Sequence, residues 1–310
     1  QGWGIWCFDG AAPTITNCTI TGNYDVGIYC LLNSSPAITN CKIIDNTGEG
    51  IYCNGASPVI TNCTISNNAG GSVESRSSST AEYRAISIDG CVIENNGKGL
   101  YIQDAQAGPS VVIKGCKIIS NSGDGIYLYL YDRVATISNC IIAKNSHDGL
   151  YASNGACKTI TNCTITGNHS YGVDTRSTGL PNIVNSILWN NTGGELYGNC
   201  AAIYSCVKNG VSGVGNFNID PCFVNTDSND FHLRVDSMCI DAGAPWFDYS
   251  NEPLPNGGRI NVGAYGNTPE ATETTDADGD GISDNWERHY WPSDDPNQHD
   301  PNDDLDGDGF

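Results

Sequence analysis

Residues 15–23 read Ile-Thr-Asn-Cys-Thr-Ile-Thr-Gly-Asn, and similar stretches recur along the first two thirds of the chain. The last asparagine of the stretch returns at intervals of 23, 22, 28, 25, 24, 23 and 23 residues. A repeat of this length indicates a unit that cannot bury its apolar side alone and has to stack on its neighbours. The eight positions are Asn23, Asn46, Asn68, Asn96, Asn121, Asn145, Asn168 and Asn191.

Each repeat contains short apolar alternations broken by asparagine and glycine, which predict strands and turns rather than helices. In the first copy we expect Ile15, Cys18, Ile20 and Ile28 to point inward, with a bend at Asn17. Equivalent residues of stacked coils would lie about 4.8 Å apart, so the asparagines would form a ladder of amide hydrogen bonds. The sequence therefore predicts an all-β fold, a parallel β-helix solenoid of about eight coils.

The repeat resembles the right-handed parallel β-helix of secreted bacterial proteins, the superfamily that includes the pectate lyases. The resemblance covers roughly residues 1–195. It implies the fold rather than a reaction, because such helices carry many different functions.

The stretch that follows is similar to the end region of large exported proteins that carry surface anchors. The segments that match are Asp220–Val224, Phe231–Leu233, Cys239–Gly243 and Asn261–Gly266. The resemblance implies an extracellular or cell-surface bacterial protein. The expected domains are the β-helix at 1–195, an irregular β-rich C-terminal cap at 196–267, and an acidic calcium-binding tail at 268–310.

The charge of the chain is acidic and unevenly distributed. It has 14 Lys and Arg against 35 Asp and Glu, a formal net charge of −21 at pH 7. Residues 270–310 hold 14 of the acids and one base, Arg288, so this tail alone carries −13. Without a basic stripe to neutralise phosphates we expect no nucleic-acid partner, and no apolar run is long enough for a membrane span. Residue 1 falls inside a coil and is not Met, which predicts a processed form or a piece of a longer protein.

The 15 cysteines mostly occupy repeat positions. Neighbours in one column have parallel Cβ vectors, and residues on facing sheets are about 10 Å apart, so we expect small core residues rather than disulfides or metal ligands. Disulfides are expected instead at the irregular end, among Cys200, Cys206, Cys222 and Cys239. The two columns are Cys18, Cys41, Cys63, Cys91, Cys116, Cys140 and Cys163, and Cys7, Cys30 and Cys53.

Residues 276–287 match the spacing of a calcium loop. Carboxylates stand at loop positions 1, 3, 5 and 9, a backbone carbonyl at 7 and a glutamate at 12, with glycine at 6 for the sharp turn. The predicted Ca²⁺ ligands are Asp276, Asp278, Asp280, Ile282 (through its carbonyl), Asp284 and Glu287, and a second, incomplete copy contributes Asp304, Asp306 and Asp308. The pair resembles the calcium repeats of thrombospondin type 3 and dockerin-like segments. An acidic, solvated linker is the alternative interpretation.

Alignment of the coils suggests one candidate catalytic group. It places Asp124 and Asp148 on neighbouring coils, with Lys98 and His147 nearby. Two carboxyls about 5 Å apart could act as the acid and nucleophile of a retaining glycosidase, or hold calcium for a lyase. The alternative is a solvated turn column with a Lys98–Asp124 ion pair.

A second candidate is the longest coil, between Asn68 and Asn96. Arginine or tyrosine in this coil could abstract a sugar-ring proton, although an ordinary surface loop explains the same sequence. The candidate residues are Glu74, Arg76, Glu82, Tyr83 and Arg84.

Three functions follow from these patterns. The first, which we favour, is a non-catalytic extracellular structural or adhesive protein that associates end to end, because uncapped strands recruit further strands. The second is a polysaccharide lyase or glycosidase that works along one sheet. The third is a carbohydrate-binding module, in which repeated outward tyrosines stack on sugars, although a plain aromatic ladder would explain the same tyrosines. They are Tyr29, Tyr52, Tyr101, Tyr127 and Tyr151.

Overall fold

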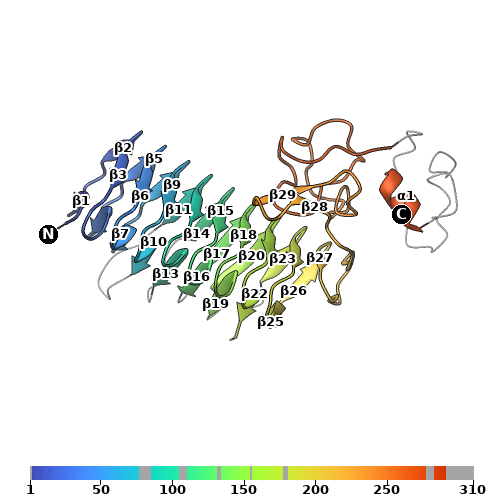
Figure 1. Ribbon diagram of the computed structural model, residues 1–310, viewed down its shortest axis with the longest axis horizontal. Coiled ribbons are helices and arrows are strands. Elements are labelled where there is room, and N and C mark those ends of the chain that lie inside the picture. Colours follow the sequence, from blue (N-terminus) through green and yellow to red (C-terminus); the bar gives the residue numbers. More distant parts are fainter. Residues whose placement is uncertain are drawn as a thin grey trace.

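The computed structural model describes residues 2–76, 85–104, 110–130, 134–153, 156–176, 181–276 and 283–290. Within these ranges the chain winds through three parallel sheets of nine strands each, always in the same order, and forms a rod (Figure 1). We call one passage through the three sheets a coil and number the coils 1 to 9, from β1–β3 to β25–β27. The predicted parallel β-helix solenoid is confirmed.

The strands are short and follow one another around the rod. Sheet A contains β1 (Ile5–Cys7), β4 (Ile28–Leu31), β7 (Glu49–Asn54), β10 (Gly71–Arg76), β13 (Leu100–Asp104), β16 (Ile126–Leu130), β19 (Leu150–Ser153), β22 (Tyr171–Thr175) and β25 (Gly194–Gly198). Sheet B contains β2 (Thr14–Thr16), β5 (Ala37–Thr39), β8 (Val59–Thr61), β11 (Ile86–Asp89), β14 (Val111–Lys114), β17 (Ala135–Ser138), β20 (Cys157–Thr161), β23 (Asn182–Val184) and β26 (Ala201–Ile203). Sheet C contains β3 (Thr19–Thr21), β6 (Lys42–Ile44), β9 (Thr64–Ser66), β12 (Val92–Glu94), β15 (Lys117–Ile119), β18 (Ile141–Ala143), β21 (Thr164–Thr166), β24 (Ile187–Trp189) and β27 (Cys206–Val207).

The chain turns sharply between sheets B and C at a single residue with positive φ. In coils 1 to 8 this residue is asparagine or glycine, for example Asn17 at 54° and Gly90 at 63°. Glycine and asparagine tolerate this left-handed conformation better than other residues do. The bend expected at Asn17 is therefore present, and it recurs in each of these coils.

The asparagine ladder predicted from the repeat is confirmed at the corner between sheets C and A. The side-chain amide of Asn46 donates to Oδ1 of Asn68 at 2.8 Å, and the same contact continues from coil to coil. The ladder ends at Asn191, whose amide donates to the carboxylate of Glu195 in coil 9. Buried amide groups are thus satisfied by their counterparts in the next coil.

The core of the rod is filled by isoleucine and cysteine. Ile28, Ile43 and Ile60 are fully buried, one from each sheet. All 15 cysteines are free thiols, including the four at the irregular end, where we expected disulfides. Cys18, in coil 1, is exposed, whereas the later members of its column are buried, as expected for small core residues.

The segment that follows the coils folds back along the rod. Residues 208–219 hydrogen-bond to coil 9, for instance from Phe217 N–H to the Ser205 carbonyl at 3.1 Å. Residues 220–276, which we call the strap, contain the antiparallel hairpin of β28 (Phe223–Asn225) and β29 (Asp230–Leu233) and lie beside the later coils (Figure 1). The short helix α1 (Asp284–Tyr290) follows the strap.

The strap packs on the outer face of sheet C in coils 5 to 8. Phe231, in the strap, is 1% exposed and packs in one cluster with Ile119 and Ile141 of sheet C. The side-chain amide of Asn139 adds hydrogen bonds to the carbonyls of Ala264 and Gly266 at 3.1 and 2.8 Å. In coils 1 to 4 the equivalent outward positions are mostly polar, as at Thr19, Lys42, Thr64 and Glu94. The change from polar to apolar outward residues explains why the strap lies where it does.

Candidate functional site

The structure brings Asp124 and Asp148 together on neighbouring coils, just before β16 and β19 of sheet A. Oδ1 of Asp124 accepts the backbone N–H of Asp148 at 3.0 Å, and Oδ1 of Asp148 accepts the backbone N–H of Tyr171 at 2.9 Å. Each carboxylate therefore binds the backbone of the following coil. Asp148 is only 6% exposed. Its hydrogen bond, like that of Asp124, therefore helps to hold one coil against the next.

The electrostatic surroundings of this pair are acidic. Burial raises the pKa of Asp124, and the neighbouring charge of Asp148 adds to the increase, whereas the hydrogen bond from the Asp148 amide opposes it. His147 is exposed, with Nδ1 4.0 Å from Oδ1 of Asp124. Lys98 lies opposite Asp124 on the preceding coil, as the alignment predicted, and the adjacent Gly99 N–H donates to the Asp124 carbonyl at 3.1 Å. Its Nζ, however, is 3.0 Å from Oε2 of Glu74, so the Lys98 side chain pairs with that carboxylate and not with Asp124.

A column of aromatic side chains runs along the outer face of sheet A. The strand registers place one such position in every coil. Tyr101 and Tyr127 stack with ring centroids 4.5 Å apart and an interplanar angle of 4°, and Tyr127 and Tyr151 stack at 4.9 Å and 10°. Since the ring faces contact one another, they are not offered to a sugar, and the stacked-ladder interpretation of the tyrosines fits the structure. Burial raises the pKa of Tyr127 to about 12.

Two coils interrupt this tyrosine ladder with a carboxylate. Glu74 takes the ladder position between Tyr52 and Tyr101, and Asp174 takes it between Tyr151 and Tyr197. The first substitution belongs to the long coil singled out from the sequence. We did not anticipate the second, although Val-Glu-Ser-Arg at 73–76 and Val-Asp-Thr-Arg at 173–176 are recognisably similar. The remaining candidates of the long coil, Glu82, Tyr83 and Arg84, lie outside the described residues.

The described part of the calcium loop comprises its first position and its last turn. Helix α1 begins at Asp284, loop position 9, and the backbone N–H of Asp284 donates to the carbonyl of Thr275 at 2.8 Å, which closes the loop. Glu287 is 1% exposed. No cluster of three or more metal-ligating side chains occurs among the described residues. The other predicted ligands, Asp278, Asp280, Ile282, Asp304, Asp306 and Asp308, lie outside them.

Helix α1 is attached to the strap rather than separate from it. The indole N–H of Trp286 donates to the carbonyl of Ile240 at 3.4 Å, and the ring meets Phe217 edge to face at 6.4 Å. The side-chain amide of Asn285 also donates to the carbonyl of Val235. The predicted calcium loop is therefore connected through its helix to the body of the protein.

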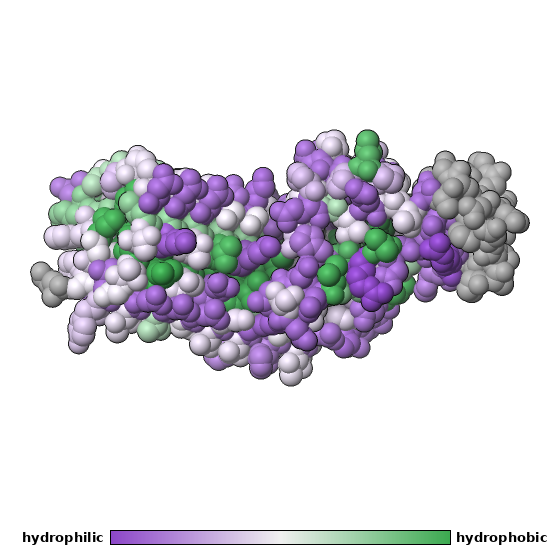
Figure 2. Space-filling model, turned by 45° about the horizontal axis from the view of Figure 1, so that its top comes forward, coloured by the Kyte–Doolittle hydropathy of each residue, from purple (hydrophilic) through white to green (hydrophobic). Residues whose placement is uncertain are grey.

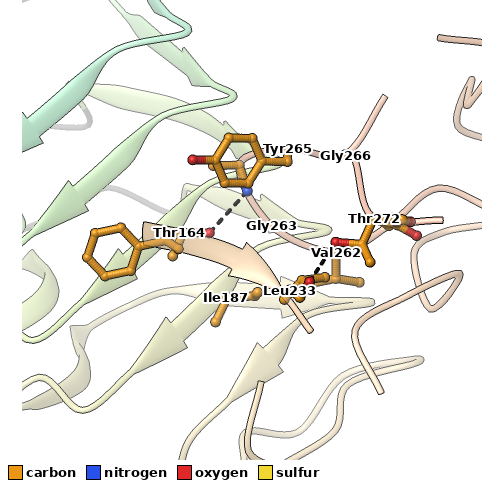
Figure 3. Close-up of a pocket in the computed structure, with 11 residues that line it drawn as sticks. Thr164, Ile187, Leu233, Val262, Gly263, Tyr265, Gly266 and Thr272 are labelled. Atoms are coloured by element: carbon orange, nitrogen blue, oxygen red, sulfur yellow. Dashed lines mark hydrogen bonds between the residues drawn. The ribbon is translucent and has the colours of Figure 1, made fainter. Parts of the chain in front are cut away.

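Two small cavities lie at the seam between the strap and sheet C. The first, of about 10 Å³, is bordered by Thr164, Tyr265 and Thr272 and is bridged by hydrogen bonds on either side (Figure 3). A second, of about 130 Å³, is bordered by Lys117, Tyr265 and Glu270. Neither lies on sheet A, so neither includes Asp124 or Asp148.

The surface itself is mixed. Figure 2 shows apolar patches alternating with polar residues along the visible flank. The large exposed apolar side chains of the first two coils include Trp6 at 55%, Phe8 at 43% and Leu32 at 48%. Among the described residues there is no helix long and apolar enough to span a membrane.

A family model supports the fold. The family model described as "Right handed beta helix region" matches residues 1–112 and 99–232. A solved structure that resembles the chain is the crystal structure of pectate lyase Pel9A, at 17% identity, with 79% of this chain and 68% of that chain covered and a TM-score of 0.47. No curated protein matches the chain.

Proposed function

The chain belongs to the right-handed β-helix family, and from this premise we propose that it is a non-catalytic structural or adhesive protein of the bacterial cell exterior. The observation that carries the proposal is the engagement of Asp124 and Asp148. Their oxygens accept backbone N–H groups of the next coil, as stabilising side chains do, and Lys98 binds Glu74. A pair of catalytic carboxyls would instead need open access to substrate between them.

End-to-end association is part of this proposal. Coils stack through rows of backbone hydrogen bonds that lie along the rod, and β25, the last strand of sheet A among the described residues, would offer the same groups to a second copy. Electron microscopy of the purified protein tests this directly. Ordered filaments support the proposal, and uniform single particles at all protein concentrations contradict its filament component.

Bound calcium is the second component of the proposal. Asp276, Asp284 and Glu287 would supply carboxylate oxygens, and the remaining oxygens would come from the intervening loop. Support comes from the closed loop between Thr275 and Asp284 and from the buried position of Glu287. The ion would stabilise the docked helix α1, and titration of the calcium-free protein with Ca²⁺ by calorimetry tests whether it binds.

A second candidate function is binding or cleavage of a polysaccharide along sheet A. The observation that favours it is the pair of acid–arginine groups in the tyrosine ladder, Glu74 with Arg76 and Asp174 with Arg176. Incubation with a panel of acidic and neutral polysaccharides, followed by chromatography of the products, separates the two functions. Shortened or unsaturated products would overturn the non-catalytic proposal.

A further inference from the structure

The two interruptions of the tyrosine ladder share one construction, four coils apart on the same face. In each, a carboxylate occupies the ladder position. It pairs with an arginine two residues later, at the end of the strand or directly after it. An aromatic ring of the next coil lies beside the arginine in both cases. The ladder position is aromatic in the other seven coils, so the ladder itself does not require this construction.

The first site is built around Glu74 in β10. Glu74 is 3% exposed and pairs with Nε of Arg76 at 2.5 Å and with Nζ of Lys98 at 3.0 Å. The guanidinium carbon of Arg76 lies 5.5 Å from the centroid of the Tyr101 ring, and Nζ of Lys98 lies 4.9 Å from it. Half of the Arg76 side chain, 49%, remains exposed.

The second site is built around Asp174 in β22. Asp174 is fully buried and pairs with Nε of Arg176 at 2.8 Å. It also accepts the backbone N–H of Arg176 at 3.0 Å. The guanidinium carbon lies 5.9 Å from the Tyr197 ring, and 60% of the Arg176 side chain is exposed.

These contacts prepare each guanidinium for binding. The carboxylate fixes the Nε side and the aromatic ring supports one edge, so the remaining N–H donors face solvent in a restricted orientation. The carboxylate offsets the positive charge of the arginine. A ligand at this site therefore meets directed N–H donors with little net charge. Such a group suits vicinal hydroxyls, with the tyrosine hydroxyls along the ladder as further partners.

We propose that Arg76 and Arg176 are two anchor points for one extended, neutral polysaccharide chain that lies along the rod over sheet A. Four coils separate the two sites by about 19 Å, and each coil advances by a length comparable with one pyranose unit. The chain would cross the edges of Tyr101, Tyr127 and Tyr151, whose faces are already stacked. This inference rests on the proposed non-catalytic adhesive function and names the partner that the adhesive surface holds.

The charge of this face favours a neutral chain over an acidic one. The strand register places the uncharged residues Gln103, Tyr129 and Ser153 between the two arginines, and each arginine is offset by its own carboxylate. A polyuronate laid along this column would lose solvation of its carboxylates with no further cation in the column to compensate. A neutral chain meets no such cost.

Calorimetry with the full chain and neutral β-linked oligosaccharides of increasing length tests the inference. We expect the affinity to rise about tenfold or more once the oligosaccharide is long enough, at about five units, to reach both arginines. Arg76→Ala and Arg176→Ala should each remove this rise. Arg234→Ala is the matched control, because Arg234 is an exposed arginine of the strap that also pairs with an acid two residues on, Asp236.

A second pair of variants tests whether lost binding comes from lost folding, since removal of Arg176 takes away the ion-pair partner of buried Asp174, and removal of Arg76 leaves Glu74 paired with Lys98 alone. Glu74→Tyr and Asp174→Tyr continue the aromatic ladder and detach the arginine from its carboxylate. We expect both to keep the thermal midpoint of the parent protein and to lose the length-dependent rise in affinity. Retention of full affinity in both tyrosine variants would overturn the role of these sites.

The remaining outcomes separate this inference from the function on which it rests. If no neutral oligosaccharide binds, or if an oligogalacturonate binds more tightly, the inference is wrong while the structural function stands. If an oligosaccharide is cleaved during the titration, the non-catalytic function is wrong. Binding without cleavage, with loss in the arginine variants, supports both.

Discussion

The side-chain amide of Asn121 donates to Oδ1 of Asn145 at 3.0 Å, and the same oxygen accepts the backbone N–H of Asn121, also at 3.0 Å. One asparagine oxygen therefore receives two donors from the preceding coil. Oδ1 of Asn121 is used in the same way by Asn96. Because Asn121 is fully buried, neither water nor another side chain can replace these bonds without a structural change.

Asn121→Ala should therefore lower the free energy of unfolding by about 2–4 kcal/mol, because it removes the acceptor of the buried Asn96 backbone N–H and the side-chain bonds to Asn145 and to the Ile93 carbonyl. Urea denaturation followed by circular dichroism measures the loss. Thr136→Ala, on the outer face of sheet B, is a suitable control and should cost far less. Equal losses for the two variants would mean that the ladder adds no stability beyond ordinary side-chain contacts.

The strap contains a carboxyl group that should make stability depend on pH. Burial raises the pKa of Glu252 from 4.5 to about 7, against the opposing hydrogen bonds from the amides of Asn267 and Asn261. The folded state then holds this proton more tightly than the unfolded state. The contribution of Glu252 to stability is therefore greatest below pH 4.5 and is lost as the pH rises to about 7.

Glu252→Gln keeps an oxygen for both amide donors and removes the titration. We expect the stability of the parent protein to fall relative to this variant by up to about 3 kcal/mol between pH 4.5 and pH 7. Thermal midpoints measured for both proteins across this range provide the difference. A parent protein that gains stability over the variant as pH rises would show that the amide donors outweigh burial.

Phe231 connects the strap to sheet C, and Phe231→Ala should weaken this contact. Loss of a fully buried phenylalanine costs about 3–5 kcal/mol, here from the packing against Ile119, Ile141 and Phe223. We expect faster hydrogen exchange and proteolysis within residues 220–276. Exchange in coils 1 to 4 serves as the internal control, because the described strap residues pack on later coils. Uniformly faster exchange along the whole rod would contradict a local role.

Calcium binding can be tested through Glu287, the predicted bidentate ligand. Glu287→Gln should weaken Ca²⁺ binding about tenfold or more, since the bidentate carboxylate at loop position 12 is a principal ligand. Calorimetric titration measures the affinity. Glu273→Gln is the control, because Glu273 is exposed and precedes the loop. If both variants bind Ca²⁺ like the parent protein, residues 276–287 are an acidic linker and not a calcium loop.

Much of the rod could be predicted from the sequence because its interactions repeat. The spacing of the asparagines sets the coil length, and alternation within each strand sets which residues point inward, as at Ile15 and Ile20. The same alignment also placed Asp124 next to Asp148. In each case the partner of a residue is its own counterpart one repeat away.

The remaining features depend on contacts that the repeat does not encode. The outward apolar residues Ile119 and Ile141 indicate that something covers sheet C, but the residues that bond there are up to 127 positions away, as for Asn139 and Gly266. The pairing of Lys98 with Glu74 was missed because β10 lacks the Gly-Ile-Tyr segment that guided the alignment. Glu74 therefore gave no sign that it stands where other coils have tyrosine.

The strap also limits how the length of the rod can change. Its hydrogen bonds to Asn139, Thr164 and Asn185 fall on three consecutive coils. Deletion or duplication of one coil in this half would therefore shift every later strap contact by one repeat. In coils 1 to 4 the described residues contact their counterparts in adjacent coils. A whole repeat can be gained or lost there, because the same contacts between coils form again. Among homologues of this sequence, the number of repeats should therefore vary in coils 1 to 4 and stay constant in the coils that contact the strap.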